Sequence, residues 1–137
     1  MASLRAALAL TLQASAVPYG YTLTIWSTGA VLIAALGAPP VSGVMSFTAG
    51  AVSAYWLLSA LSDKDFDHAP PSRQEYRSLG RLHWLPITFS IGLAALFARV
   101  AHWWAWPVTS FAATSIYVLA ASSHLALIGR TRDESKR

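Results

Sequence analysis

The chain has 137 residues, of which 55% are hydrophobic and only 12% are charged. Soluble domains carry roughly 25% charged residues, so this composition argues against a soluble protein and favours a membrane protein. The absence of cysteine excludes disulfides, thiolate nucleophiles and Cys-ligated metals. The net charge is +4. In a membrane protein, basic residues mark the cytoplasmic side and its anionic headgroups, so we expect lipid contacts and no nucleic acid.

Residues 1–18 combine an early basic residue, Arg5, with a short apolar run and small residues at 14–16. This is the pattern of a secretory signal, although the apolar run is at the lower limit of length. Cleavage would place the basic centre of the chain outside the cell, against the charge distribution described below. We predict instead an uncleaved interfacial helix, which Pro18 separates from the next segment or bends away from it.

Residues 19–61 form the first of two predicted transmembrane hairpins. Each half is an uncharged apolar run of about 20 residues, the length of helix that crosses a hydrocarbon core of roughly 30 Å. Between the halves, Gly37-Ala38-Pro39-Pro40 ends one helix and begins the next. Because this connection is so short, we expect the two helices to be antiparallel neighbours.

Residues 83–128 form the second predicted hairpin, whose two spans meet at the aromatic turn Trp103-Trp104-Ala105-Trp106-Pro107. A polar segment, 62–82, separates the hairpins, and a polar tail, 129–137, follows the last span. The predicted fold class is therefore an all-α integral membrane protein. It is a four-helix transmembrane bundle made of two antiparallel hairpins and preceded by a short N-terminal interfacial helix.

The basic residues predict the orientation of the bundle. All Lys and Arg residues except Arg99 lie in the N-terminal segment, the central segment or the tail, which share one side of a protein with four spans. The positive-inside rule places that side in the cytoplasm. Trp103, Trp104 and Trp106 would then form an aromatic belt at the opposite interface. We expect a multi-pass protein of the plasma (inner) membrane with both termini cytoplasmic.

The central segment contains a predicted short basic helix. Its start is a capping box, Ser72-Arg73-Gln74-Glu75, which follows two prolines. Arg73, Arg77 and Arg81 then recur every four residues and fall on one helix face. Each basic residue near an anionic membrane surface contributes about 1 kcal/mol of attraction. We expect this stripe to contact lipid headgroups.

Small residues recur at helical spacing in the predicted spans, where they allow membrane helices to approach closely. The candidate packing faces are Ser46, Gly50 and Ala54 in the second span, Ser90, Ala94 and Ala98 in the third, and Ala30, Ala34 and Ala38 in the first. These faces either pack inside one bundle or hold another subunit. The sequence leaves both interpretations open.

Arg99 is the one charged residue within a predicted span, and it lies near the outer end of that span. All six acidic residues are on the predicted cytoplasmic side, so no carboxylate of the same chain is within reach. One interpretation is that the side chain extends outward to lipid headgroups, which lowers its burial cost. The other is that Arg99 and His102, one turn later, bind an anion, a lipid phosphate or the carboxylate of a partner.

His83 and His124 lie at similar depth in the second hairpin and could serve as axial ligands of haem b. Both residues fit equally well as ordinary interfacial histidines. The spans contain no carboxylate, and no catalytic set, metal-ligand cluster or phosphate-binding loop occurs. We expect no catalytic residue, no metal site and, apart from the haem alternative, no cofactor.

The sequence favours a non-catalytic function, namely a scaffold or accessory subunit that acts by helix packing with itself or with another membrane protein. The first alternative is an oligomeric transporter or channel for a small solute. It rests on Arg99, on Ser, Thr and Tyr side chains that could line a pore, and on a faint likeness of residues 26–29 to 89–92 that would make the hairpins parallel repeats. The second alternative is a haem-binding electron carrier that uses His83 and His124.

Overall fold

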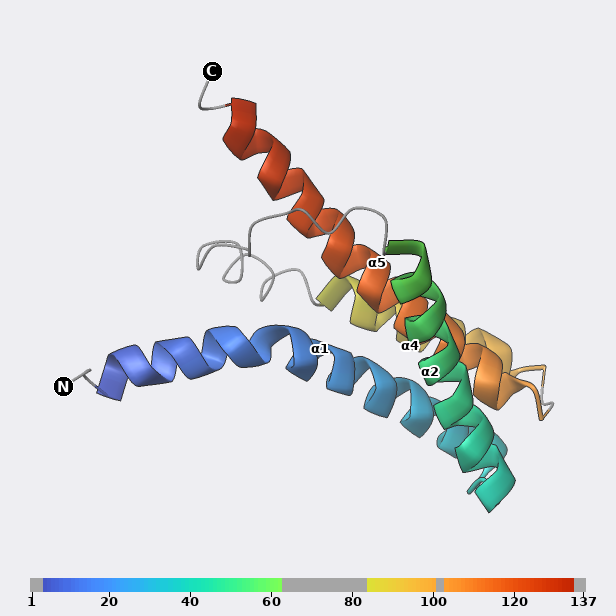
Figure 1. Cartoon of the computed structure of the whole chain (residues 1–137). Coiled ribbons are helices and arrows are strands. Elements are labelled where there is room, and N and C mark those ends of the chain that lie inside the picture. Colours follow the sequence, from blue (N-terminus) through green and yellow to red (C-terminus); the bar gives the residue numbers. More distant parts are fainter. Residues whose placement is uncertain (1–3, 63–83, 101–102, 135–137) are drawn as a thin grey trace.

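The computed structural model describes residues 4–62, 84–100 and 103–134, with side chains described for 18–61, 84–100 and 103–124. The helices are α1 (Leu4–Leu36), α2 (Val41–Ser62), α4 (Trp84–Ala98) and α5 (Ala105–Glu134) (Figure 1). Within these residues the structure is all-helical, which confirms the predicted all-α class. Pro18–Leu36 and Val41–Leu61 are each long and apolar enough to cross a membrane, and α4 is a shorter apolar helix.

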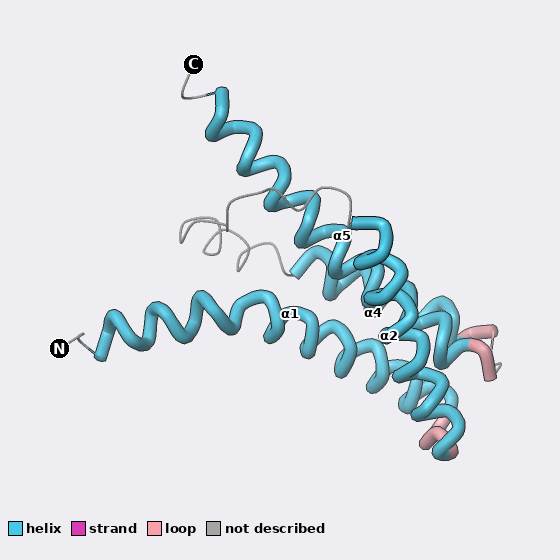
Figure 2. Tube along the Cα trace, viewed as in Figure 1, coloured by secondary structure: helices cyan, strands magenta, loops and turns pink. Residues whose placement is uncertain are grey.

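α1 is one continuous helix that contains Pro18. Of the two expectations for Pro18, a separation of residues 1–18 from the next segment is not found in the described part of α1, and the helix changes direction along its length (Figure 2). A proline within a helix removes one backbone hydrogen bond and bends the helix without having to end it. The carbonyl of Pro18 still accepts a hydrogen bond, from the hydroxyl of Thr22 at 2.8 Å.

The turn between α1 and α2 follows the sequence prediction. Gly37 has a φ of 84°, in the left-handed region where glycine commonly ends a helix. Its N–H donates to the carbonyl of Ile33 at 2.9 Å. The carbonyl of Pro40 then accepts from the N–H groups of Gly43 and Val44, at 2.8 and 3.2 Å, and so forms the first turn of α2.

α5 is the central helix of the bundle, because it packs against α1, α2 and α4, whereas α1 packs in addition only against α4. α1 and α2 do not pack along each other despite the short turn, and they diverge from it (Figure 1). The expected antiparallel contact in the first hairpin is therefore wrong, whereas α4 and α5 do pack together. The two hairpins therefore differ in packing.

The second hairpin also differs from its predicted boundaries. α4 has 15 residues, about 22 Å at 1.5 Å per residue, which is shorter than the predicted span. It ends where the N–H groups of Arg99 and Val100 donate to the carbonyls of Leu96 and Phe97, at 3.2 and 3.1 Å, in the tighter pattern typical of a last helical turn. α5 has 30 residues and extends well into the predicted polar tail.

The hydrophobic core joins all four helices near the two short turns. Its buried members are Leu32, Ala98, Ala105 and Trp106, with Leu36 and Phe47 packed against them. Trp106 is 8% exposed, and its ring meets that of Phe47 edge-on at a centroid distance of 6.4 Å. The prediction that Trp106 belongs to an interfacial belt is therefore wrong. Trp103, at 77% exposed, has the exposure such a position requires.

Candidate functional site

The outer surface of the bundle is apolar, while part of its interior is polar. Large hydrophobic side chains are exposed on every helix, among them Trp26, Ile33, Val52, Trp56, Phe89, Leu96 and Leu119. The buried polar side chains are all hydroxyls: Thr24, Thr28, Ser90, Thr109, Ser110 and Thr114. Soluble proteins expose few such large apolar groups in contiguous areas. This distribution is the one expected for helices surrounded by lipid or by other helices.

Three of these six buried hydroxyls bond to their own helix. Thr24 donates to the carbonyl of Gly20, and Thr28 donates to that of Thr24, both at 2.9 Å. Ser110 donates to the carbonyl of Pro107 at 3.1 Å. Such bonds let a hydroxyl be buried in an apolar helix without a partner on another helix. These three groups are therefore satisfied locally and are not directed at a ligand.

One hydroxyl pair links two helices. The hydroxyl of Tyr21 on α1 lies 3.3 Å from that of Thr114 on α5, and the rings of Tyr21 and Tyr117 lie 5.8 Å apart. Neither Tyr21 nor Thr114 was predicted to be a site residue. The spacing of four between Ser110 and Thr114, and between Thr24 and Thr28, was the available signal, because it places polar groups on one face of an apolar helix.

Two buried hydroxyls have no hydrogen-bond partner among the described residues, namely Ser90 Oγ on α4 and Thr109 Oγ1 on α5. Burying a hydroxyl without a partner costs free energy. These two groups are therefore the polar atoms most open to a further hydrogen bond. The sequence predicted for Ser90 only a place on a small-residue packing face.

The predicted small-residue faces are used unequally. Gly50 and Ala54 are buried, and Ser46 is half-buried with its hydroxyl bonded to the carbonyl of Gly43 at 2.9 Å. Ser90, Ala94 and Ala98 are also buried in this single chain. By contrast, the corresponding residues of the first span are all exposed: Ala30, Ala34 and Ala38. Two of the three faces are thus covered by helices of the same chain.

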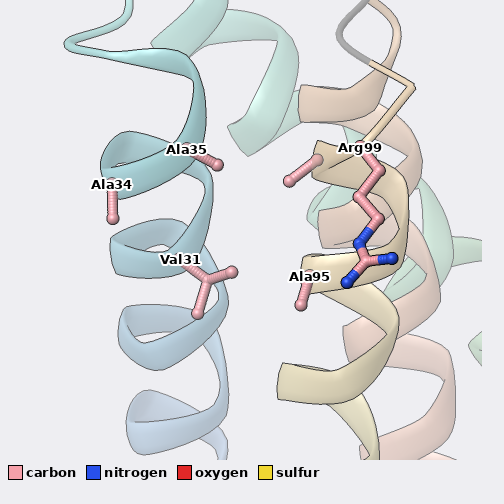
Figure 3. Close-up of a pocket in the computed structure, with 6 residues that line it drawn as sticks. Val31, Ala34, Ala35, Ala95 and Arg99 are labelled. Atoms are coloured by element: carbon pink, nitrogen blue, oxygen red, sulfur yellow. The ribbon is translucent and has the colours of Figure 1, made fainter.

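Arg99 borders an open groove between α1 and α4, with a volume of about 420 Å³. The groove is lined by Val31, Ala34, Ala35, Ala95, Ala98 and Arg99. The guanidinium is turned back along α4, to the level of Ala95 (Figure 3). None of the described side chains is acidic, so Arg99 has no ion pair within the described part of the chain.

Several predicted site residues lie outside the described residues: His83, His102, Arg73, Arg77 and Arg81. The pairing of Arg99 with His102 and the basic stripe therefore stay predictions. His124 is half-buried on α5, and its haem partnership with His83 likewise stays a prediction. Within the described part of the chain, no group of three His, Cys, Asp or Glu residues could hold a metal ion.

No protein-family model, curated protein or solved structure matches the chain. The functional reading therefore rests on the geometry of its helices and on the chemistry of the residues described above.

Proposed function

We propose that the chain is a multi-pass membrane protein without catalytic activity, which acts as a scaffold or accessory subunit by packing against itself or another membrane protein. The observation that supports this best is the environment of α2. This helix packs chiefly against α5, and its Phe47 also reaches the core beside Gly29 of α1, although the helix is long and apolar enough to cross a membrane.

α2 contacts α5 through a narrow seam of small residues. Gly50 and Ala54 lie buried in the seam, whereas Val52, between them in sequence and opposite to them on the helix, is 61% exposed. Most other large side chains of α2 are exposed as well, whereas Phe47 and Leu58 are half-buried; the exposed ones are Val41, Val44, Met45, Tyr55, Trp56, Leu57 and Leu61. A helix held by one seam has most of its surface available to lipid or to a partner helix.

The proposed location and orientation rest on the sequence. The apolar helices favour a bilayer, and the basic termini and central segment favour a cytoplasmic location for both chain ends in the plasma (inner) membrane. The described interior holds hydroxyls but no buried charge, which favours a packing role over chemistry.

Site-specific crosslinking in the native membrane tests this proposal. The chain has no cysteine, so Val52→Cys introduces a unique thiol on the open side of α2. Leu96→Cys is the matched control, because Leu96 is exposed to a similar degree, 58%, but lies on α4. We expect oxidative crosslinking of the Val52→Cys variant alone, at twice the chain mass or to one other protein in fixed ratio. A monomer in native mass spectrometry, with no crosslink at either site, would overturn the proposal.

A second candidate is transport of a small polar solute by an oligomer. The observation that favours it is the pair of unpartnered hydroxyls, Ser90 and Thr109, inside an otherwise apolar bundle. Such groups could hydrogen-bond a passing solute. Solute flux in reconstituted vesicles that falls in a Ser90→Ala, Thr109→Val variant would support it, and vesicles of the native protein that show no flux would exclude it.

A further inference from the structure

The groove between α1 and α4 combines one permanent positive charge with an otherwise apolar lining. Three of its residues come from α1 (Val31, Ala34 and Ala35) and three from α4 or the turn after it (Ala95, Ala98 and Arg99). Four of the six are alanines, whose short side chains leave the groove open. The groove therefore has an apolar lining and one positively charged side chain, that of Arg99.

We propose that this groove binds an anionic phospholipid, with the lipid phosphate on Arg99 and an acyl chain between α1 and α4. The inference rests on the membrane location proposed above. A guanidinium stays charged in proteins and presents donors in a fork that matches phosphate oxygens. An unpaired charge beside apolar surface is costly in a bilayer, so an anionic headgroup relieves the cost.

The position of the guanidinium supports a lipid over a free anion. Arg99 lies just beyond the last residue of α4, its side chain turns back to the level of Ala95 (Figure 3), and it is one of the residues that line the groove. A free phosphate would leave the apolar lining uncovered. A phospholipid supplies both the phosphate for Arg99 and the hydrocarbon for Ala34 and Ala95.

α4 also provides an internal comparison. A second open groove, of about 540 Å³, is lined by Leu85, Thr88, Phe89, Gly92, Leu93 and Leu96, and carries no charged residue. An acyl chain in this groove would have no cation to hold its headgroup. We therefore expect lipid in the second groove to show no preference for anionic headgroups.

Native mass spectrometry of the full chain, extracted from its membrane, tests the site. The probes are phosphatidylglycerol and phosphatidylcholine with identical acyl chains, and inorganic phosphate alone. We expect wild type to prefer phosphatidylglycerol and Arg99→Gln to lose this preference by roughly tenfold, the scale of one charge-assisted hydrogen bond. Arg99→Lys should keep part of it, because the charge remains. Equal preference in wild type and Arg99→Gln would overturn the proposal.

Two bulky variants distinguish lipid from free phosphate. Ala95→Phe fills the Arg99 groove and keeps the charge, whereas Gly92→Phe adds the same bulk to the charge-free groove, where an added Cβ has no atom within 4 Å. Both positions are exposed, so neither change disturbs the core. We expect only Ala95→Phe to reduce the preference for phosphatidylglycerol. Unchanged preference in Ala95→Phe, with competition by inorganic phosphate, would show a simple anion contact and overturn the lipid site.

This experiment is independent of the crosslinking test. It changes residues of α4 and the turn after it, whereas the scaffold proposal rests on the open side of α2. If the protein showed no preference for phosphatidylglycerol, a Val52→Cys crosslink would still support the scaffold proposal. If no crosslink formed, a preference for phosphatidylglycerol that depends on Arg99 would still support the lipid site.

Discussion

Gly50 on α2 lies directly against the carbonyl oxygen of Pro107 on α5. A Cβ at position 50 would overlap that oxygen and the hydroxyl of Ser110, and would lie 2.9 Å from the carbonyl carbon of Pro107. The two backbones approach this closely only because glycine has no side chain. Since α5 is the helix that α2 chiefly packs against within the described residues, this contact is central to how α2 is held.

Gly50→Ala is therefore expected to lower the free energy of unfolding by about 1–3 kcal/mol, the cost of overpacking a close contact. Gly92→Ala is the matched control, because a Cβ there meets no atom within 4 Å and alanine favours helix by up to about 1 kcal/mol over glycine. Thermal unfolding in detergent, followed by circular dichroism, measures both. Equal melting temperatures for the two variants would show that the Gly50 contact does not limit the packing of α2.

Gly50 also shows what the sequence could and could not predict. The helices and the turn at 37–40 were predictable, because apolar length, glycine and proline act locally. Small residues at a spacing of four indicated a packing face at Gly50. They could not indicate that the face meets α5 instead of α1, because both neighbours are apolar helices and the choice depends on shape complementarity over the whole bundle.

The same limit explains why the sequence did not predict the burial of Trp106 or the direction of the Arg99 side chain. A tryptophan next to a turn has the same local sequence whether it faces lipid or fills the space beside Phe47 and Leu32. The sequence placed Arg99 near the end of its span, and the structure places it in the turn after Ala98. The direction of its side chain depends on the groove that α1 forms with α4, which no local pattern encodes.

The hydrogen bond between Tyr21 and Thr114 predicts energetic coupling between α1 and α5. Their hydroxyls lie 3.3 Å apart, and interhelical bonds of this kind are worth about 0.6 kcal/mol on average in a membrane protein. A double-mutant cycle of Tyr21→Phe and Thr114→Val should show a coupling of that size. Thr48→Val is the control partner, because the Thr48 hydroxyl bonds the carbonyl of Val44 within α2. Additive effects for Tyr21 and Thr114 would show that the pair contributes nothing measurable.

Trp106 is buried and Trp103 is exposed, so truncation should destabilise the protein strongly at Trp106 and hardly at all at Trp103. Trp106→Ala would remove a buried ring from the core and its contact with Phe47, at a cost of about 3–5 kcal/mol. Trp103→Ala changes an exposed side chain and should alter the free energy of unfolding by no more than about 0.5 kcal/mol. Chemical denaturation in detergent measures both variants. A larger loss in Trp103→Ala would contradict the core assignment of Trp106.

Thr109 and Thr28 form a matched pair that tests the unpartnered hydroxyls. Both are buried threonines, and valine replaces each hydroxyl by a methyl group of nearly the same shape. The hydroxyl of Thr28 bonds the carbonyl of Thr24, so Thr28→Val should cost about 0.5–1.5 kcal/mol. Thr109 Oγ1 has no such bond within the described part of the chain.

Thr109→Val should therefore be neutral or raise the free energy of unfolding by about 1 kcal/mol, because it removes a buried polar atom that lacks a partner. Thermal unfolding of the two variants in the same detergent decides the sign. A loss of stability in Thr109→Val as large as in Thr28→Val would show that the Thr109 hydroxyl is hydrogen-bonded in the native protein. Its partner would then be a group outside the described residues, a bound molecule or a neighbouring chain, and Ser90→Ala should be examined for the same loss.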